Sequence, residues 1–122
     1  MLVNDWRLMI HNGNIFGGCV MKGLYILDEE NKPVEIDDIE KWGEFYGSGR
    51  RRVGEDFVRN SRISTVFLGL DHSFSEEGPP ILYETMIFGG KFDCEQWRYE
   101  TREEAIAGHR AAVRKVVMED RD

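Results

Sequence analysis

The sequence is poor in the features that define several common protein classes. Only two cysteines, Cys19 and Cys94, occur in 122 residues, and they lack the close spacing of a zinc site. So few cysteines are typical of a reducing cytosol, although one disulfide between them stays open. No apolar run approaches the roughly eighteen residues of a membrane span, and no basic-then-apolar leader opens the chain. These absences predict a cytoplasmic protein with no membrane span and no cleaved signal peptide.

The motifs of common catalytic and metal sites are also missing. The three histidines, His11, His72 and His109, form no HxH or HxxxH pair, and no serine lies in a GxSxG elbow. We therefore expect no metal site and no cofactor, and we favour a binding protein over an enzyme. One enzymatic alternative stays open: a small hydrolase that uses His72 and His109 with Glu84, since histidine titrates near neutrality.

The charge of the chain is acidic overall but uneven. The formal net charge is −7, which argues against general nucleic-acid binding because phosphate contacts need a basic surface. Residues 50–62 differ, with five arginines against only Glu55 and Asp56. An acidic protein with one local basic patch fits a small anionic ligand better than a nucleic-acid duplex.

The hydrophobic pattern predicts an α+β fold in a single domain over residues 1–122. An antiparallel sheet should pack against a long C-terminal helix, which a stripe of apolar residues places between Arg102 and about Met118. Thr101 and Glu104 form a capping box at its start. The predicted strands are 24–27, 34–36, 63–70, 81–88 and 96–100.

A second, short helix is predicted over residues 38–46. Asp37 with Glu40 forms its N-cap pattern, and apolar residues recur at helical spacing after it. The strands at 63–70 and 81–88 have apolar residues on both alternating faces, which predicts central strands covered on both sides. Glu84 lies in the second of these strands, either as a polar anchor in a pocket or in a salt bridge to an arginine.

Two arginines of the C-terminal helix are the strongest candidates for ligand binding. Arg110 and Arg114 lie four residues apart, one helical turn from each other, and no acidic residue lies three or four positions from either. Like charges at this spacing are destabilising by a few tenths of a kcal/mol, roughly. We expect these side chains to bind an anion outside the helix, such as a ligand phosphate, an acid of the sheet or a partner subunit.

The long connection between the two apolar strands is the second candidate. Residues 69–80 (GLDHSFSEEGPP) far exceed a hairpin turn, with glycine at a mobile entrance and prolines at a stiff exit. We interpret it as a flap that closes over a ligand. Phe74 or Tyr83 would stack on a base, and the remaining candidate ligand-binding residues are His72, His109 and Arg52 of the flexible GSGRRR segment.

The segments ISTVFLGLDHSFSEEGPPILYETMIFGG and RYETREEAIAGHRAAVRKV carry a resemblance to a known family. They are similar to small proteins of bacteriophage and prophage genomes with an STVFLGLDH, ETMIFGG and EEAxxGH signature. The size and layout also resemble the phage Thoeris anti-defence proteins. This second resemblance implies an oligomer in the cytoplasm of an infected bacterium, which sequesters a cyclic ADP-ribose signal without cleaving it.

The function hypothesis is therefore a phage-encoded, non-enzymatic sponge for a small phosphorylated, nucleotide-like molecule. We expect it to be a homo-oligomer. The alternative is an acidic protein that inhibits a host defence protein by direct binding, because the net charge of −7 would steer it to a basic surface.

Overall fold

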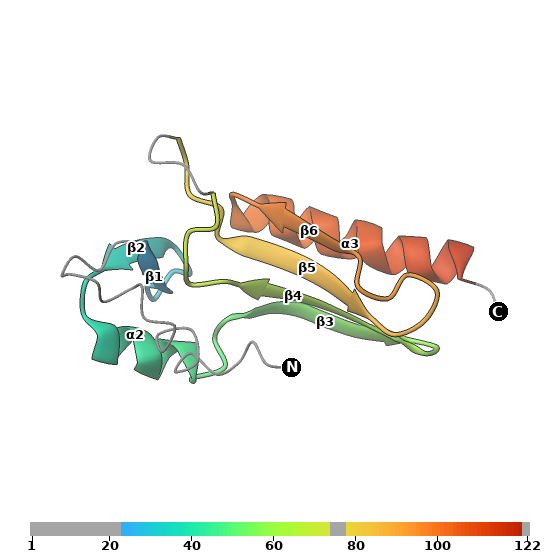
Figure 1. The fold of residues 1–122 in the computed structure, drawn as a ribbon, viewed down its shortest axis with the longest axis horizontal. Coiled ribbons are helices and arrows are strands. Elements are labelled where there is room, and N and C mark those ends of the chain that lie inside the picture. Colours follow the sequence, from blue (N-terminus) through green and yellow to red (C-terminus); the bar gives the residue numbers. More distant parts are fainter. Residues whose placement is uncertain (1–22, 74–77, 121–122) are drawn as a thin grey trace. The chain divides into compact units, whose positions relative to one another are not determined.

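The computed structural model describes residues 23–73 and 78–120, and its packing groups the chain into two compact units (Figure 1). Unit 1 contains the described residues up to Arg51 and the short segment Gly69–Asp71. Unit 2 contains Arg52–Leu68 and the described residues from His72 onwards. Each unit combines antiparallel strands with one helix, so the predicted α+β class is confirmed. The single domain over residues 1–122 stays a prediction.

Unit 1 is a β-hairpin followed by a short helix. Strands β1 (Leu24–Leu27) and β2 (Pro33–Ile36) pair antiparallel, and helix α2 (Ile39–Tyr46) comes next. The turn forms because the Asp28 carboxylate accepts hydrogen bonds from two backbone N–H groups of the turn, at 2.8 and 2.9 Å. The predicted strands and the helix are confirmed within one residue at each end.

The N-cap of α2 differs from the prediction. Asp38, not Asp37, has extended backbone angles, and its carboxylate accepts hydrogen bonds from the N–H groups of Glu40 and Lys41. The two aspartates are adjacent, so the capping pattern alone does not distinguish them. The Asp38 carbonyl accepts a helical hydrogen bond from the Trp42 N–H at 3.0 Å, so the helix begins one residue later than the Asp37–Glu40 pattern predicts.

The segment Gly69–Asp71 is held firmly within unit 1. The Gly69 carbonyl accepts hydrogen bonds from the Tyr25 N–H and the Trp42 indole N–H, each at 2.9 Å, and the Asp71 N–H donates to Gly23. Gly69 has a φ of +78°, and a Cβ there would lie 3.2 Å from the Trp42 nitrogen. The expectation that Gly69 makes the entrance of the 69–80 connection mobile is therefore wrong, whereas Phe74 and Ser75 of the same predicted entrance lie outside the described residues.

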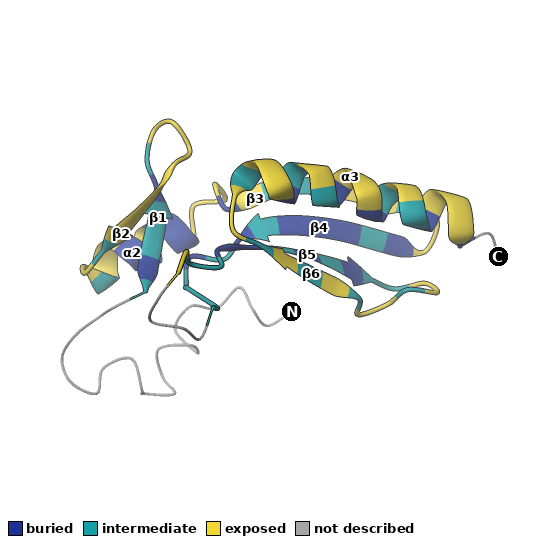
Figure 2. Ribbon diagram, turned by 90° about the horizontal axis from the view of Figure 1, so that it is seen from above, coloured by how far each residue is buried: buried dark blue, intermediate teal, exposed yellow. Residues whose placement is uncertain are grey.

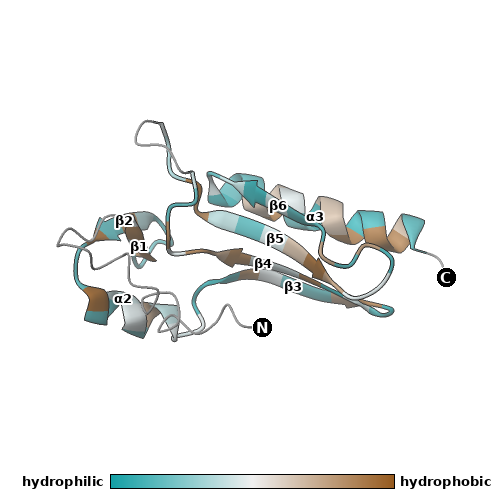
Figure 3. Ribbon diagram, in the orientation of Figure 1, coloured by the Kyte–Doolittle hydropathy of each residue, from teal (hydrophilic) through white to brown (hydrophobic). Residues whose placement is uncertain are grey.

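Unit 2 is a four-stranded antiparallel sheet with one long helix. The strands β3 (Arg52–Val58), β4 (Ser61–Phe67), β5 (Tyr83–Phe88) and β6 (Gln96–Tyr99) lie in the order β3-β4-β5-β6 (Figure 1). Helix α3 (Arg102–Glu119) contacts all four of them. The strands predicted at 63–70 and 81–88 correspond to the two central ones, although β4 ends at Phe67 and β5 begins at Tyr83, and β3 was not predicted. The β4 strand is among the most hydrophobic elements (Figure 3).

One face of this sheet is covered by α3, whose buried residues form a stripe along its inner side (Figure 2). Ile63 of β4 and Ile87 of β5 pack against Ala112 and Val116 of the helix, and all four are almost fully buried. The predicted apolar stripe is confirmed in its centre. Its outer member Val117 is exposed instead.

Both ends of α3 are satisfied by side chains. The predicted capping box is present, because the Thr101 side chain and the Glu104 carboxylate each accept a hydrogen bond from the other's backbone N–H. At the other end the Arg59 guanidinium donates to the carbonyls of Val116 and Val117, at 3.0 and 3.1 Å. The last turn of the helix has no basic residue of its own, so the β3–β4 turn supplies this cap.

The opposite face of the sheet carries no second helix or strand of the described part of unit 2. The central strands were predicted to be covered on both faces. In the described part of this unit one helix, α3, covers one face. We call this surface the open face, since strand alternation places its side chains away from α3. Its residues are Arg52, Glu55, Phe57, Arg62, Ser64, Val66, Glu84, Met86, Phe88, Gln96 and Arg98.

Candidate functional site

Arg110 and Arg114 lie on the outer side of α3, where both are exposed. Neither makes a hydrogen bond, an ion pair or a ring contact with any residue that the structure describes. The exposed neighbours between and beside them on the helix are Ala107 and Ala111, whose methyl groups leave the guanidinium groups accessible. This arrangement leaves all donors of the pair available to an anion from outside the helix.

Most of the other arginines that the structure describes are engaged. Arg59 caps α3, Arg62 pairs with Glu55 at 2.7 Å, and Arg98 pairs with Glu84 at 3.1 Å. Arg102 differs, because its buried Nη1 has no hydrogen-bond partner among the described residues. The α3 pair is exposed as well as unpaired, so its donors are available to an anion from solution.

The predicted flexible GSGRRR segment is anchored rather than free. Arg50 donates to the carbonyls of Leu27 and Asp28 in unit 1, at 3.3 and 2.6 Å. The Arg51 guanidinium lies 3.9 Å from the centre of the Tyr46 ring, and its burial lowers the pKa of this group. These two arginines stabilise unit 1. They do not form a loop that could close on a phosphate.

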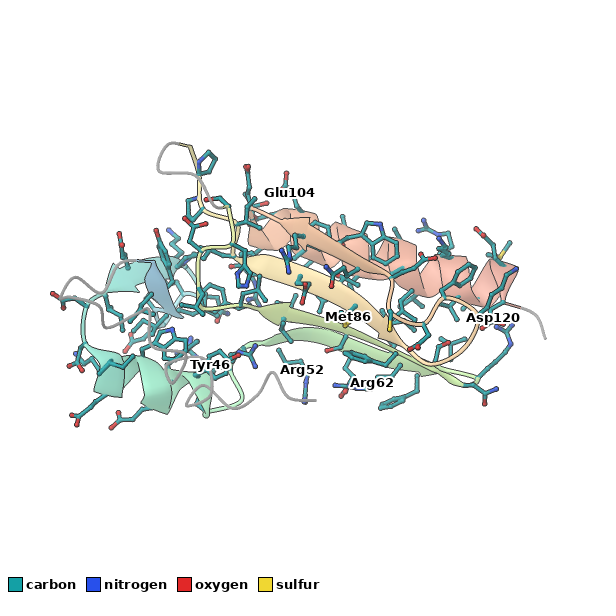
Figure 4. All side chains as sticks on the ribbon, in the orientation of Figure 1. Tyr46, Arg52, Arg62, Met86, Glu104 and Asp120 are labelled. Carbon is teal, nitrogen blue, oxygen red and sulfur yellow. The ribbon has the colours of Figure 1, made fainter. Side chains whose placement is uncertain are left out.

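Arg52 begins β3 and lies on the open face (Figure 4). Its register partner is Val66, whereas the neighbouring Thr65 faces α3. Its guanidinium is 3.8 Å from the Glu55 carboxylate. Arg52 and the α3 arginines therefore lie on opposite sides of the sheet and do not converge within one molecule.

Tyr83 is fully buried and does not offer a ring to a ligand. Its ring packs edge-on against Phe67, with 5.4 Å between centroids. Burial raises the pKa of its hydroxyl, and the nearby Arg102 guanidinium opposes that shift. Tyr83 therefore belongs to the core of unit 2, and the second stacking candidate, Phe74, lies outside the described residues.

His109 is part of a buried polar network under α3. Its Nδ1 is hydrogen-bonded to the Thr65 hydroxyl at 2.7 Å, and its Nε2 to the Asp56 carboxylate at 2.7 Å. Thr65 is bonded to the Thr85 hydroxyl at 2.6 Å, which in turn accepts from the Tyr99 hydroxyl at 3.1 Å. The network joins all four strands to the helix, and it uses both nitrogens of the imidazole.

These contacts do not favour the hydrolase alternative. A general acid–base histidine needs a ring nitrogen within reach of the substrate, and both nitrogens of His109 are occupied. Glu84 forms the ion pair with Arg98 on the open face, which is the structural role that the sequence left open for it. His72 lies elsewhere, in the connection between β4 and β5.

The β4–β5 connection lies at the amino-terminal end of α3. The His72 N–H donates to the Ile81 carbonyl at 3.0 Å, and the Leu82 N–H donates to Tyr99, two residues before the helix cap. Arg110 lies eight residues beyond the start of the helix, about 12 Å along its axis. The described part of the predicted flap that belongs to unit 2 is therefore not beside the arginine pair.

A shallow depression of about 370 Å³ lies at this end of unit 2. Two of its lining residues are Glu100 and Glu104, and the others are Ile81, Arg98 and Tyr99. Arg98 is already paired with Glu84, and the Glu104 carboxylate is used in the capping box. Two carboxylates against one paired guanidinium make this depression unsuitable for a phosphate, so the arginine pair remains the candidate functional site.

Metal ligands do not gather anywhere in residues 23–73 and 78–120, where no three His, Cys, Asp or Glu side chains come together. Cys94 is a free, exposed thiol, and Cys19 lies outside the described residues. No helix in this part of the chain is both long and apolar enough to cross a bilayer.

Comparisons with known proteins add no family to this picture. The sequence matches no family model, and searches of curated proteins and of solved structures found no similar protein. The geometry of the described residues alone therefore carries the functional argument.

Proposed function

We propose that this protein is a non-enzymatic sponge that binds a small phosphorylated, nucleotide-like molecule through Arg110 and Arg114. A cyclic ADP-ribose isomer is the ligand that the resemblance to phage anti-defence proteins implies. The protein would then act in the cytoplasm of an infected bacterium. The observation that carries this proposal is the pair of exposed arginines on α3 with no partner among the described residues.

The chemistry of the pair suits phosphate. Each guanidinium presents a planar fork of N–H donors that matches two oxygens of a phosphate, and a pyrophosphate has two such groups to offer. The two side chains stand one helical turn apart, about 6 Å, which is close to the spacing of adjacent phosphates. A dianion between them would also remove the repulsion between their like charges.

The rest of the outer side of α3 suits the remainder of such a ligand. Val117 and Met118 are 42% and 54% exposed, one turn beyond Arg114. Apolar side chains next to a cationic pair can cover the uncharged part of a nucleotide while the arginines hold its phosphates. Affinity without turnover is consistent with a site that contains no titrating nucleophile or base of its own.

A double replacement tests this site. Arg110→Ala/Arg114→Ala should weaken ligand binding by about 100-fold or more, because each charge-assisted hydrogen bond contributes about 1.5–3 kcal/mol. Binding is measured by calorimetry and by thermal shift with a panel of cyclic ADP-ribose isomers and cyclic dinucleotides. At a hundred times the dissociation constant, ligand should stabilise the wild type by about 2.7 kcal/mol, and the compound should be recovered intact.

The matched control is Arg52→Ala/Arg98→Ala, which removes the same charge from two paired arginines on the other side of the sheet. This control should bind the ligand nearly as well as the wild type. Equal losses in both double variants would show a general charge effect and contradict a site on α3. Turnover of the compound would contradict the sponge.

The acidic surface supports a second candidate function, direct inhibition of a host defence protein. The net charge of −7 accelerates association with a basic partner and makes the rate fall steeply with ionic strength. Recovery of one basic host protein in a pull-down, with no thermal shift across the nucleotide panel, would favour this candidate over the sponge.

A further inference from the structure

The open face of the sheet carries the most exposed large hydrophobic side chain of the described chain. Phe57 of β3 is 72% exposed, although it lies in a strand rather than in a loop. Its register partner in β4 is Arg62, and the partner of Arg62 in β5 is Phe88. The Arg62 guanidinium lies 4.8 Å from the centre of the Phe88 ring, so the three side chains form one row across the sheet.

The charged groups of the open face are already paired with one another. The Arg62 Nε donates to the Glu55 carboxylate at 2.7 Å, and this hydrogen bond holds the pKa of Glu55 below its ordinary value. The Arg98 Nε donates to the Glu84 carboxylate at 3.1 Å. Three arginines against two glutamates give this face a net charge of +1, whereas the whole chain carries −7.

This composition argues against a nucleic acid as the occupant of the open face. Exposed aromatics on a sheet can stack bases, but the phosphates need unpaired basic side chains and a basic surround. Here the arginines are paired and the protein is acidic. A protein that is acidic overall but nearly neutral on its contact surface fits better. Another copy of this chain has both properties.

Pairing through the two edges of the sheet is opposed by the edge strands β3 and β6. Strand β3 carries charged residues at Arg52, Glu55 and Asp56, and its register shifts between Arg52 and Gly54, whereas β6 is only 4 residues long. Charges and bulges of this kind protect an edge against strand addition. The exposed hydrophobic surface therefore points to packing of sheet faces rather than of sheet edges.

We propose that the open face is the contact surface of a homodimer in which two sheets pack face to face about a two-fold axis. The row of Phe57, Arg62 and Phe88, which crosses the face near the β3–β4 turn, supplies the apolar contact, and the paired charges lie beside it along the face. Repulsion between copies of charge −7 disfavours contact through their other surfaces. The α3 arginines lie on the opposite side of the sheet and remain accessible, so this proposal does not depend on the proposed ligand.

The area of the open face is small for a stable dimer. A seven-residue strand is about 23 Å long and four strands span about 15 Å, a flat footprint of roughly 350 Å². A standard stable interface buries about 800 Å² on each partner. Even with the relief of the side chains, we expect a weak dimer with a dissociation constant in the micromolar range.

Analytical ultracentrifugation of the full chain from low micromolar to near-millimolar concentration tests this proposal. The wild-type mass should rise from the 14.2 kDa of one chain towards twice that value. Phe57→Asp should stay monomeric throughout, because it places a charge in the apolar row of the interface. Added salt should strengthen the wild-type dimer, since it screens the repulsion between acidic copies while the apolar contact persists.

The control is Val34→Asp, which introduces the same charge at a hydrophobic residue of unit 1 that is 41% exposed. It should associate like the wild type, and both variants should keep the wild-type melting temperature. A wild type that is monomeric at every concentration overturns the proposal. So does a Phe57→Asp variant that still dimerises, since the contact would then lie on another surface. Neither result bears on nucleotide binding by Arg110 and Arg114.

Discussion

His109→Ala is expected to lower the free energy of unfolding by about 3 kcal/mol, the combined effect of a cavity and a lost hydrogen-bond partner. The imidazole is 8% exposed and links β3 and β4 to α3 through Asp56 and Thr65. Asp56 is half exposed and can be solvated by water after the change, whereas the Thr65 hydroxyl is completely buried. Urea denaturation of the variant and the wild type measures the difference.

A double-mutant cycle shows whether the network acts as one unit. Thr65→Val should cost about 1–3 kcal/mol by itself, because it leaves the His109 Nδ1 without a partner and removes one of the two hydrogen bonds of the Thr85 hydroxyl. The double variant Thr65→Val/His109→Ala should lose less unfolding free energy than the two single variants together, by at least about 0.5 kcal/mol. Arg114→Ala, on the exposed side of the same helix, should change stability by less than about 0.5 kcal/mol. Strict additivity at Thr65 and His109 would contradict a coupled network.

Gly108→Ala is expected to destabilise the protein by about 1–3 kcal/mol, the usual cost of overpacking a tight contact. In an exposed helix the same change stabilises by about 1 kcal/mol, because alanine is the better helix former. Here a Cβ at position 108 would overlap the ring and hydroxyl of Tyr99. Tyr99 has little room to retreat, since its hydroxyl donates to Thr85.

The neighbouring exposed residue provides the control for this change. Ala107→Gly should cost about 1 kcal/mol through helix propensity alone, with no effect on packing. The midpoint of urea denaturation should therefore fall for both variants, although they change helix propensity in opposite directions. A Gly108→Ala variant more stable than the wild type would show that α3 does not approach β6 as closely as the structure has it.

Local pattern was sufficient for most of the secondary structure. The capping box of Thr101 and Glu104 is predictable because both residues act on backbone groups within one turn. Five of the described strands are predictable from apolar periodicity, and the predicted central pair is central in the sheet. Strand β3 (Arg52–Val58) was not predicted, because its charged and glycine residues hide the alternation. The N-cap was predicted at Asp37 because Glu40 lies three residues on, whereas the helix begins after Asp38.

The candidate site was predictable only in part. The local sequence around Arg110 and Arg114 lacks acidic neighbours, and the structure leaves the two side chains free among the described residues. No sequence pattern indicates that the chain after α2 turns Arg51 back onto Tyr46, or that Tyr83 packs against Phe67 of another strand. The spacing of Gly54 and Gly108 likewise gives no sign that the two residues make room for His109 and Tyr99.

By itself, the sequence determined the α+β class, the positions of both described helices and of every described strand except β3, the acidic character, and the lack of acidic helix neighbours around Arg110 and Arg114, because each depends on composition or on residues within about one turn. Only the tertiary structure decided which face of the sheet α3 covers, and with it the separation of Arg52 from Arg110 and Arg114. It also decided that His109 is structural and that Phe57 is exposed. These outcomes depend on strand order and register, which join residues far apart in the chain and which periodicity alone does not specify.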